Sequence, residues 1–161
     1  MLLREIIDFL AREGKYSKRL LDANLAPVSH VTKMPGKVVH FEIPADNVER
    51  AKTFYQKAFG WQINQYPGMQ YQMVGTTPSD QNGRPTEAGA INGGMLKRAD
   101  PVKSTVVTVD VDDIDSSLKS IEKLGGKTVQ KKQPVGDMGF TAYFKDTEGN
   151  IVGLWQSTRR M

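Results

Sequence analysis

An internal repeat constrains this 161-residue chain more than any other feature. The segments VVHFEIPADNVERAKTFYQKAFGW and STVVTVDVDDIDSSLKSIEKLGGK each contain a strand-like run, an acidic helix start, an amphipathic helix and a glycine. A shift of 66 positions aligns Asp46 with Asp112, Val48 with Ile114 and Gly60 with Gly126. The two halves are therefore expected to be copies of one folding unit.

The helix of each copy has a predicted start, a buried face and a stop. Asp46 is the expected N-cap, and Glu49 three residues later completes a capping box. Apolar residues then recur at helical spacing and predict one buried face in each helix. These residues are Val48, Ala51, Tyr55, Ala58 and Phe59 in the first copy and Ile114, Leu118, Ile121 and Leu124 in the second. Glycines then end both helices, at position 60 and at positions 125–126.

Three strand-like runs follow each helix. They cover residues 61–66, 70–74 and 88–96 in the first half and 127–132, 139–144 and 150–156 in the second. A βαβββ unit of this size buries too little apolar surface to be stable alone, so the two units should share a sheet. The expected fold class is α+β, with two paired βαβββ modules that form a curved sheet cup, helices outside it and an N-terminal helical extension. The expected boundaries are 1–36 for the extension and linker, 37–98 for the first module and 99–161 for the second, with 37–157 as one domain.

The extension and the composition narrow the class of protein. Leu2, Leu3, Ile6, Ile7 and Leu10 form an apolar stripe opposite charged residues, which predicts a short amphipathic helix. No run reaches the roughly 18 apolar residues that span a bilayer, and the start of the chain lacks the apolar core of a signal peptide. We expect a cytoplasmic protein. The chain has no cysteine, which excludes disulfides and zinc–thiolate sites, and its scattered net charge of +4 predicts no nucleic-acid partner.

Three features together resemble the vicinal oxygen chelate superfamily of glyoxalases, bleomycin-resistance proteins and extradiol dioxygenases. They are the paired βαβββ modules, the opening HFEIPAD at 40–46 and the turn DTEGN at 146–150. The segment AINGGMLKR is similar to a glyoxalase-related branch of unknown activity. The resemblance covers residues 37–157. In its metal-dependent members it implies one metal ligand on the first strand and one on the last strand of each module.

Only one of those four positions carries a ligand residue here. His40 matches the first-strand position, whereas Val106, Gly153 and either Gly93 or Gly94 occupy the other three. One imidazole does not hold a divalent ion, because catalytic sites need about three protein ligands. We therefore expect neither a metal nor another cofactor.

Strand alternation predicts which side chains line the cup. The predicted ligand-binding residues are His40, Glu42, Met95, Thr108, Tyr143 and Trp155. His40 and Glu42 are also the candidates for catalysis, with His40 either a general base or a structural histidine. Residues 75–90 form either a flap over the cup or an ordinary hairpin loop.

The predicted function is the binding of a small molecule in the cup, in a protein without nucleic-acid or membrane partners that forms a homodimer. Two alternatives remain open. One is a metal-dependent lyase, isomerase or dioxygenase, and the other is an interaction module that docks through its N-terminal helix.

Overall fold

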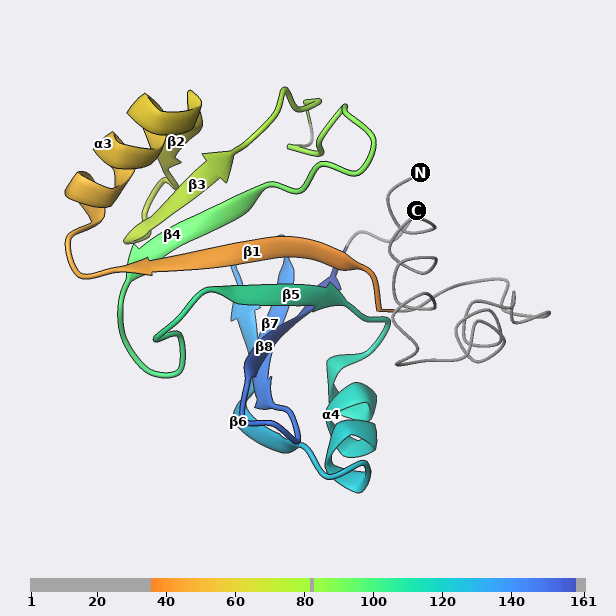
Figure 1. Ribbon diagram of the computed structural model, residues 1–161. Helices are drawn as coiled ribbons and strands as arrows, with labels where there is room; N and C mark the ends of the chain where they lie inside the picture. The colour runs from red at the N-terminus through yellow and green to blue at the C-terminus, as the bar shows by residue number, and fades with distance from the viewer. Residues whose placement is uncertain (1–35, 82, 159–161) are drawn as a thin grey trace, which may run out of the picture. The chain divides into compact units, whose positions relative to one another are not determined.

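The computed structural model describes residues 36–81 and 83–158, so the expected N-terminal helix lies outside the described residues. The chain divides into two units, 1–34 and 35–161, and the second holds all the elements below. Its first half contains β1 (Val38–Ala45), α3 (Val48–Phe59), β2 (Gln62–Gln65), β3 (Tyr71–Gly75) and β4 (Gly93–Lys97). Its second half contains β5 (Val106–Asp110), α4 (Ile114–Lys123), β6 (Lys127–Val135), β7 (Gly139–Lys145) and β8 (Ile151–Ser157). Each half therefore runs β-α-β-β-β (Figure 1).

All eight strands belong to one mixed sheet in the order β2-β3-β4-β1-β5-β8-β7-β6. The first strand of each module lies at the centre, where β1 pairs antiparallel with β5. On its other edge β1 pairs in parallel with β4, and β5 pairs in parallel with β8 in the same way. Figure 1 shows β1 and β5 side by side between the two halves. The predicted fold class, two paired βαβββ modules that share a sheet, is confirmed.

The sheet is strongly curved, as a contact between its two outer ends demonstrates. Tyr66, just after β2, donates a hydrogen bond to the sulfur of Met138 in the β6–β7 turn at 3.7 Å. In a flat sheet the edge strands β2 and β6 would lie about 34 Å apart, at ~4.8 Å per strand spacing. The sheet must therefore curl until these two turns meet, which creates one concave face.

Helix α3 begins one residue later than the sequence predicts. Asn47 caps α3 by accepting from the amide of Arg50 at 2.9 Å, and Asp113 caps α4 by accepting from that of Ser116 at 2.7 Å. Asp46 is not the N-cap, because its carboxylate pairs with Arg98 at 2.9 Å. The predicted stop at Gly60 is confirmed by its left-handed backbone, with φ of 70°.

Two apolar clusters attach the helices to the convex side of the sheet. The first consists of Ala45, Ile63, Val74 and Met95, with Phe41, Val48, Ala51, Tyr55 and Trp61 packed around them. The second consists of Ile114, Leu118, Ala142 and Leu154. The predicted helix faces extend too far, because Phe59 is 62% exposed and Leu124 is 80% exposed.

The connection between β3 and β4 is bound to itself by hydrogen bonds. Asn92 accepts from the amide of Thr76 at 3.0 Å and donates to Ser79 at 2.7 Å, and Ser79 forms a β-bridge with Pro85. The strand that was predicted over 88–96 begins only at Gly93 because this loop continues to Asn92.

Candidate ligand site on the concave face

The alternation of β1 places His40 and Glu42 on the concave face and Phe41 on the helix face. Phe41 packs into the first helix-side cluster, which fixes the orientation of its neighbours. The register with β5 sets His40 opposite Thr108 and Glu42 opposite Val106. Paired residues share a face, so Thr108 and Val106 also lie on the concave side.

Glu42 is the centre of a hydrogen-bonded cluster that joins three strands. Tyr143 of β7 donates to one carboxylate oxygen of Glu42 at 2.7 Å, and Tyr71 of β3 lies 3.4 Å from the other. The hydroxyl of Tyr71 also lies 2.7 Å from Nε2 of His40. The cluster His40–Tyr71–Glu42–Tyr143 therefore brings together side chains from both modules.

The cluster is largely removed from water. Glu42 is 7% exposed and Tyr143 is 8% exposed, and within the described residues no lysine or arginine pairs with the carboxylate. Burial raises the pKa of Glu42, although the hydrogen bonds from Tyr143 and Tyr71 oppose that shift. Burial lowers the pKa of His40 to about 4, so its imidazole is neutral at pH 7.

The two tyrosines remain hydrogen-bond donors. Burial, reinforced by the negative charge of Glu42, raises the pKa of both hydroxyls far above neutrality. Apolar residues surround Tyr143: Val102 and Val106 are buried with it, and Leu96 and Ile151 pack against these three. The cluster is thus a polar group set in an apolar floor.

The other predicted site residues are only partly brought together. Thr108 is 6% exposed beside His40. Trp155 is half-buried on the same face, opposite Asp110 and Thr141, but no ring contact or hydrogen bond joins it to the cluster within the described residues. Its placement gives the face an aromatic surface at some distance from the carboxylate.

Met95 is wrongly predicted to line this face. It is fully buried in the helix-side cluster with Ile63 and Val74. Its register partner in β1 is Ile43, while Glu42 lies opposite Gly94. The side chain at position 95 therefore lies on the opposite face from Glu42.

Tyr71 is the member of the cluster that is missing from the predicted set. Its face follows from the alternation of β3, since Val74 belongs to the helix side and Tyr71 to the other. A second signal is Gly94, because a Cβ at that position would overlap the Tyr71 hydroxyl. A glycine beside a tyrosine in neighbouring strands could have suggested this close approach.

The four positions at which the family resemblance implies metal ligands do not fit a metal ion. The Tyr71 hydroxyl fills the space beside Gly94. The Thr108 side chain fills the space beside Gly153, where a Cβ on residue 153 would lie 2.6 Å from the Thr108 hydroxyl. Val106 belongs to the buried apolar floor, which leaves His40 alone. Across residues 36–81 and 83–158, no three metal-ligating side chains come together.

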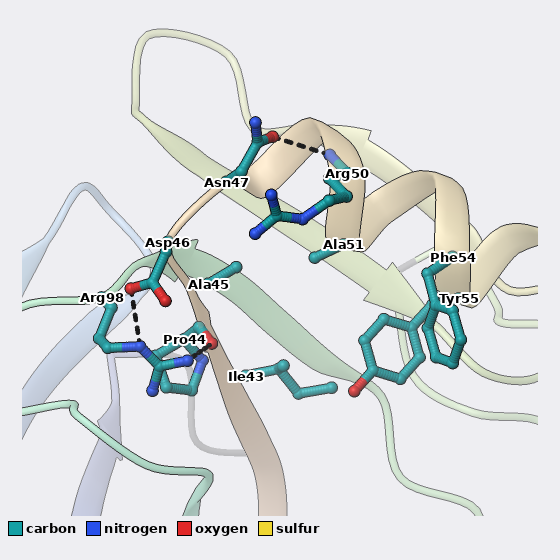
Figure 2. Close-up of a pocket in the computed structure, with 10 residues that line it drawn as sticks. All are labelled: Ile43, Pro44, Ala45, Asp46, Asn47, Arg50, Ala51, Phe54, Tyr55 and Arg98. Atoms are coloured by element: carbon teal, nitrogen blue, oxygen red, sulfur yellow. Dashed lines mark hydrogen bonds and ion pairs between the residues drawn. The ribbon is translucent and has the colours of Figure 1, made fainter.

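A separate groove of about 360 Å³ lies on the helix side, between the end of β1 and the start of α3. Figure 2 shows Asp46 paired with Arg98 at one end and Phe54 and Tyr55 at the other. Its lining includes Ile43 and Ala45, which face away from Glu42. The groove is therefore distinct from the cluster.

None of the described helices is long and apolar enough to cross a membrane.

One family match falls within the first module. Residues 37–77, from the start of β1 through β3, match the family described as bleomycin resistance protein-like N-terminal. A glyoxylase-like domain-containing protein of Didymella fabae is 31% identical over 124 residues, covering 74% of this chain and 92% of that protein. A putative glyoxylase CFP32 of Mycobacterium bovis is 30% identical over 69% of this chain, which spans only 42% of that protein.

Solved structures share the fold at low identity. A hypothetical protein, BH1468 from Bacillus halodurans C-125, has a TM-score of 0.54 and 11% identity over 78% of this chain and 97% of its own. A methylmalonyl-CoA epimerase variant of Streptomyces coelicolor, in complex with 2-nitronate-propionyl-CoA, has a TM-score of 0.53 and 15% identity over 78% of this chain and 100% of its own. Together with the match to the Didymella protein, the fold shows that this chain belongs to the glyoxylase-like proteins of the vicinal oxygen chelate superfamily.

Proposed function

We propose that the protein binds a small molecule on the concave face, at the His40–Tyr71–Glu42–Tyr143 cluster, and does so without a metal ion. The observation that carries the proposal is the buried carboxylate of Glu42, which two tyrosine hydroxyls orient in an apolar floor. A few fixed polar groups within apolar surroundings are typical of small-molecule sites.

The half-buried groups would meet the ligand first. His40 and Tyr71 are both partly exposed, whereas Glu42 lies deeper. Trp155 and Met73 would contribute apolar surface on the same face, with Met73 40% exposed. In this arrangement Glu42 and Tyr143 hold Tyr71 and His40 in place, and Thr108 supports His40 from β5.

The chain's two tryptophans provide a matched pair of reporters. Trp155 lies on the concave face, whereas Trp61 stacks on Tyr55 at 5.1 Å on the helix face. We expect a ligand from a screen of metabolites and antibiotics to change the fluorescence of the Trp61→Phe variant, in which Trp155 remains. The same ligand should leave the fluorescence of the Trp155→Phe variant unchanged. It should raise the Tm of both variants.

Two further measurements test the site and the role of metal. His40→Ala should weaken binding by about 1 kcal/mol, roughly fivefold, if it removes one neutral hydrogen bond. Treatment with a chelator should leave binding intact. Loss of binding on chelation and recovery with one divalent metal would instead support the metal-dependent lyase, isomerase or dioxygenase. If His40→Ala leaves the affinity unchanged and Trp155→Phe leaves the fluorescence change intact, the ligand binds elsewhere.

A further inference from the structure

The geometry points to a fixed direction of hydrogen bonding through the cluster, and we infer that it makes His40 an acceptor at Nδ1 that selects ligands carrying a hydrogen-bond donor. The donor would be an alcohol, an amide or an ammonium group. This inference rests on the proposed function and names the class of ligand for the same site.

The direction begins at the Glu42 carboxylate. An ionised carboxylate only accepts hydrogen bonds, so a tyrosine hydroxyl that bonds to it is the donor, and a lone pair turned toward its buried charge is repelled. Tyr143 does so at 2.7 Å and Tyr71 at 3.4 Å. Each hydroxyl has a single hydrogen, so Tyr71 has only lone pairs left for its second neighbour.

That second neighbour is Nε2 of His40, 2.7 Å from the Tyr71 oxygen. This distance alone fits either tautomer of His40. With the Tyr71 hydrogen turned to the charge of Glu42, the oxygen accepts here and Nε2 carries the hydrogen. A neutral imidazole has one N–H, and therefore Nδ1 carries a lone pair. The burial that lowers the pKa of His40 to about 4 keeps the ring neutral at the pH of the experiment below.

The surroundings leave Nδ1 available. Within the described residues it has no hydrogen-bond partner, and the ring is only half-buried. The negative charge of Glu42 lies behind Tyr71 without a lysine or arginine to compensate it in the described part of the chain. A ligand that offers N–H or O–H to Nδ1 satisfies that lone pair, whereas a carbonyl or carboxylate places an acceptor against an acceptor.

Nitrogen-15 NMR of histidine-labelled protein at pH 8 tests the direction without any ligand. We expect His40 in the Nε2–H tautomer, with its N–H protected from solvent exchange. Glu42→Leu removes the acceptor, so the Tyr71 hydroxyl should turn to Nε2 and shift His40 toward the Nδ1–H tautomer. Tyr71→Phe, which keeps the ring and Glu42, should abolish the protection. The Nδ1–H tautomer in the unaltered protein would overturn the inference.

Three probes of one size test the ligand class. We expect benzylamine and benzyl alcohol to raise Tm more than benzoate does, and we expect His40→Ala to remove that preference. A larger effect of benzoate would overturn the ligand class, even with the Nε2–H tautomer in place. No Tm shift with any of the three would count against the ligand class, whereas only the failure of the wider metabolite and antibiotic screen would count against the proposed function.

Discussion

The two modules share one fold but anchor their helices to different degrees. Helix α4 buries Ile114 and Leu118, whereas no side chain of α3 is fully buried. Phe54 and Phe59 of α3 remain 60% and 62% exposed, and the groove of Figure 2 runs along its first turns. Helix α4 is thus more firmly anchored to the sheet than α3.

The start of α4 also has a side-chain partner that, within the described residues, the start of α3 does not have. The first amide of α4, at Ile114, donates to the side chain of Gln156 in β8 at 3.0 Å. The equivalent residue of β4 is Lys97, since Gly94 and Gly153 occupy equivalent places opposite Glu42 and Thr108. Lys97 donates to the carbonyl of Asp46 and has no acceptor to offer the amide of Val48.

The polar side chains of the cluster come mostly from the other module. The first module supplies His40, Glu42 and Tyr71 to the cluster, and the second supplies Tyr143. At the places equivalent to His40 and Glu42, the second module has Val106 and Thr108. The comparison teaches that the firmer helix anchor and most of the polar cluster lie in different copies of one unit.

The largest expected effect concerns the two helix anchors. Ile114→Ala should lower the free energy of unfolding by about 3 kcal/mol, because Ile114 is fully buried and its loss leaves a cavity. Val48→Ala, the matched change in α3, should cost about 1 kcal/mol, since Val48 is only half-buried. Urea denaturation of both variants measures the difference. Equal costs would show that the modules are anchored alike.

The second effect is the pH dependence that His40 and Glu42 give to the first module. The pKa of His40 is lowered from 6.5 to about 4, so the unfolded chain takes up a proton first as the pH falls. The stability from neutral His40 is therefore present above pH 6.5 and is lost toward pH 4, by about 3 kcal/mol. Glu42, with a raised pKa, has the opposite sign and loses stability as the pH rises through its folded value.

Variants separate these two contributions. His40→Gln should remove most of the loss of stability between pH 6.5 and pH 4 and leave the opposing slope of Glu42, whereas Glu42→Gln should leave only the His40 slope. The lowered pKa values of Asp113 and Asp146 act at lower pH. Urea denaturation at a series of pH values between 4 and 8 gives both slopes. If His40→Gln loses as much stability in acid as the unaltered protein, groups other than His40 cause that loss.

The third effect compares two glycines on the concave face, one from each module. Gly153→Ala would place a Cβ 2.6 Å from the Thr108 hydroxyl and should cost about 1–3 kcal/mol through overpacking. Thr108→Ala in the same chain should recover much of that loss in thermal denaturation. Gly94→Ala should instead displace Tyr71 and also weaken ligand binding. If Gly94→Ala binds the ligand as well as the unaltered protein does, Tyr71 is not part of the ligand site.

The smallest effect tests the unequal helix starts. Lys97→Gln gives α3 the acceptor that α4 receives from Gln156, and should raise the free energy of unfolding by about 0.5–1 kcal/mol. Gln156→Lys, the reciprocal change, should lower it by a similar or larger amount. Guanidinium denaturation of the two variants checks the signs. A loss of stability in Lys97→Gln would show that the bond from Lys97 to the Asp46 carbonyl matters more.

The sequence predicts local features of this fold well, because repeat, period and turn residues act over short distances. The faces of His40, Glu42, Thr108 and Tyr143 also follow from alternation within one strand. Met95 was assigned to the wrong face because its orientation depends on the register with Ile43, which the sequence did not determine. The N-cap of α3 was misplaced because Arg98, 52 residues away, engages Asp46 and leaves Asn47 to cap the helix.

The bond between Glu42 and Tyr143 also has a kinetic consequence. These residues are 101 positions apart, so their contact forms only after the chain has closed a very long loop. Each module can gain its helix and outer strands from nearer contacts, whereas this bond requires both halves of the sheet. Docking must therefore strip water from the Glu42 carboxyl at a late step. Refolding of the His40→Gln variant should be faster near pH 4 than at pH 7, because more of that carboxyl then enters the interface uncharged.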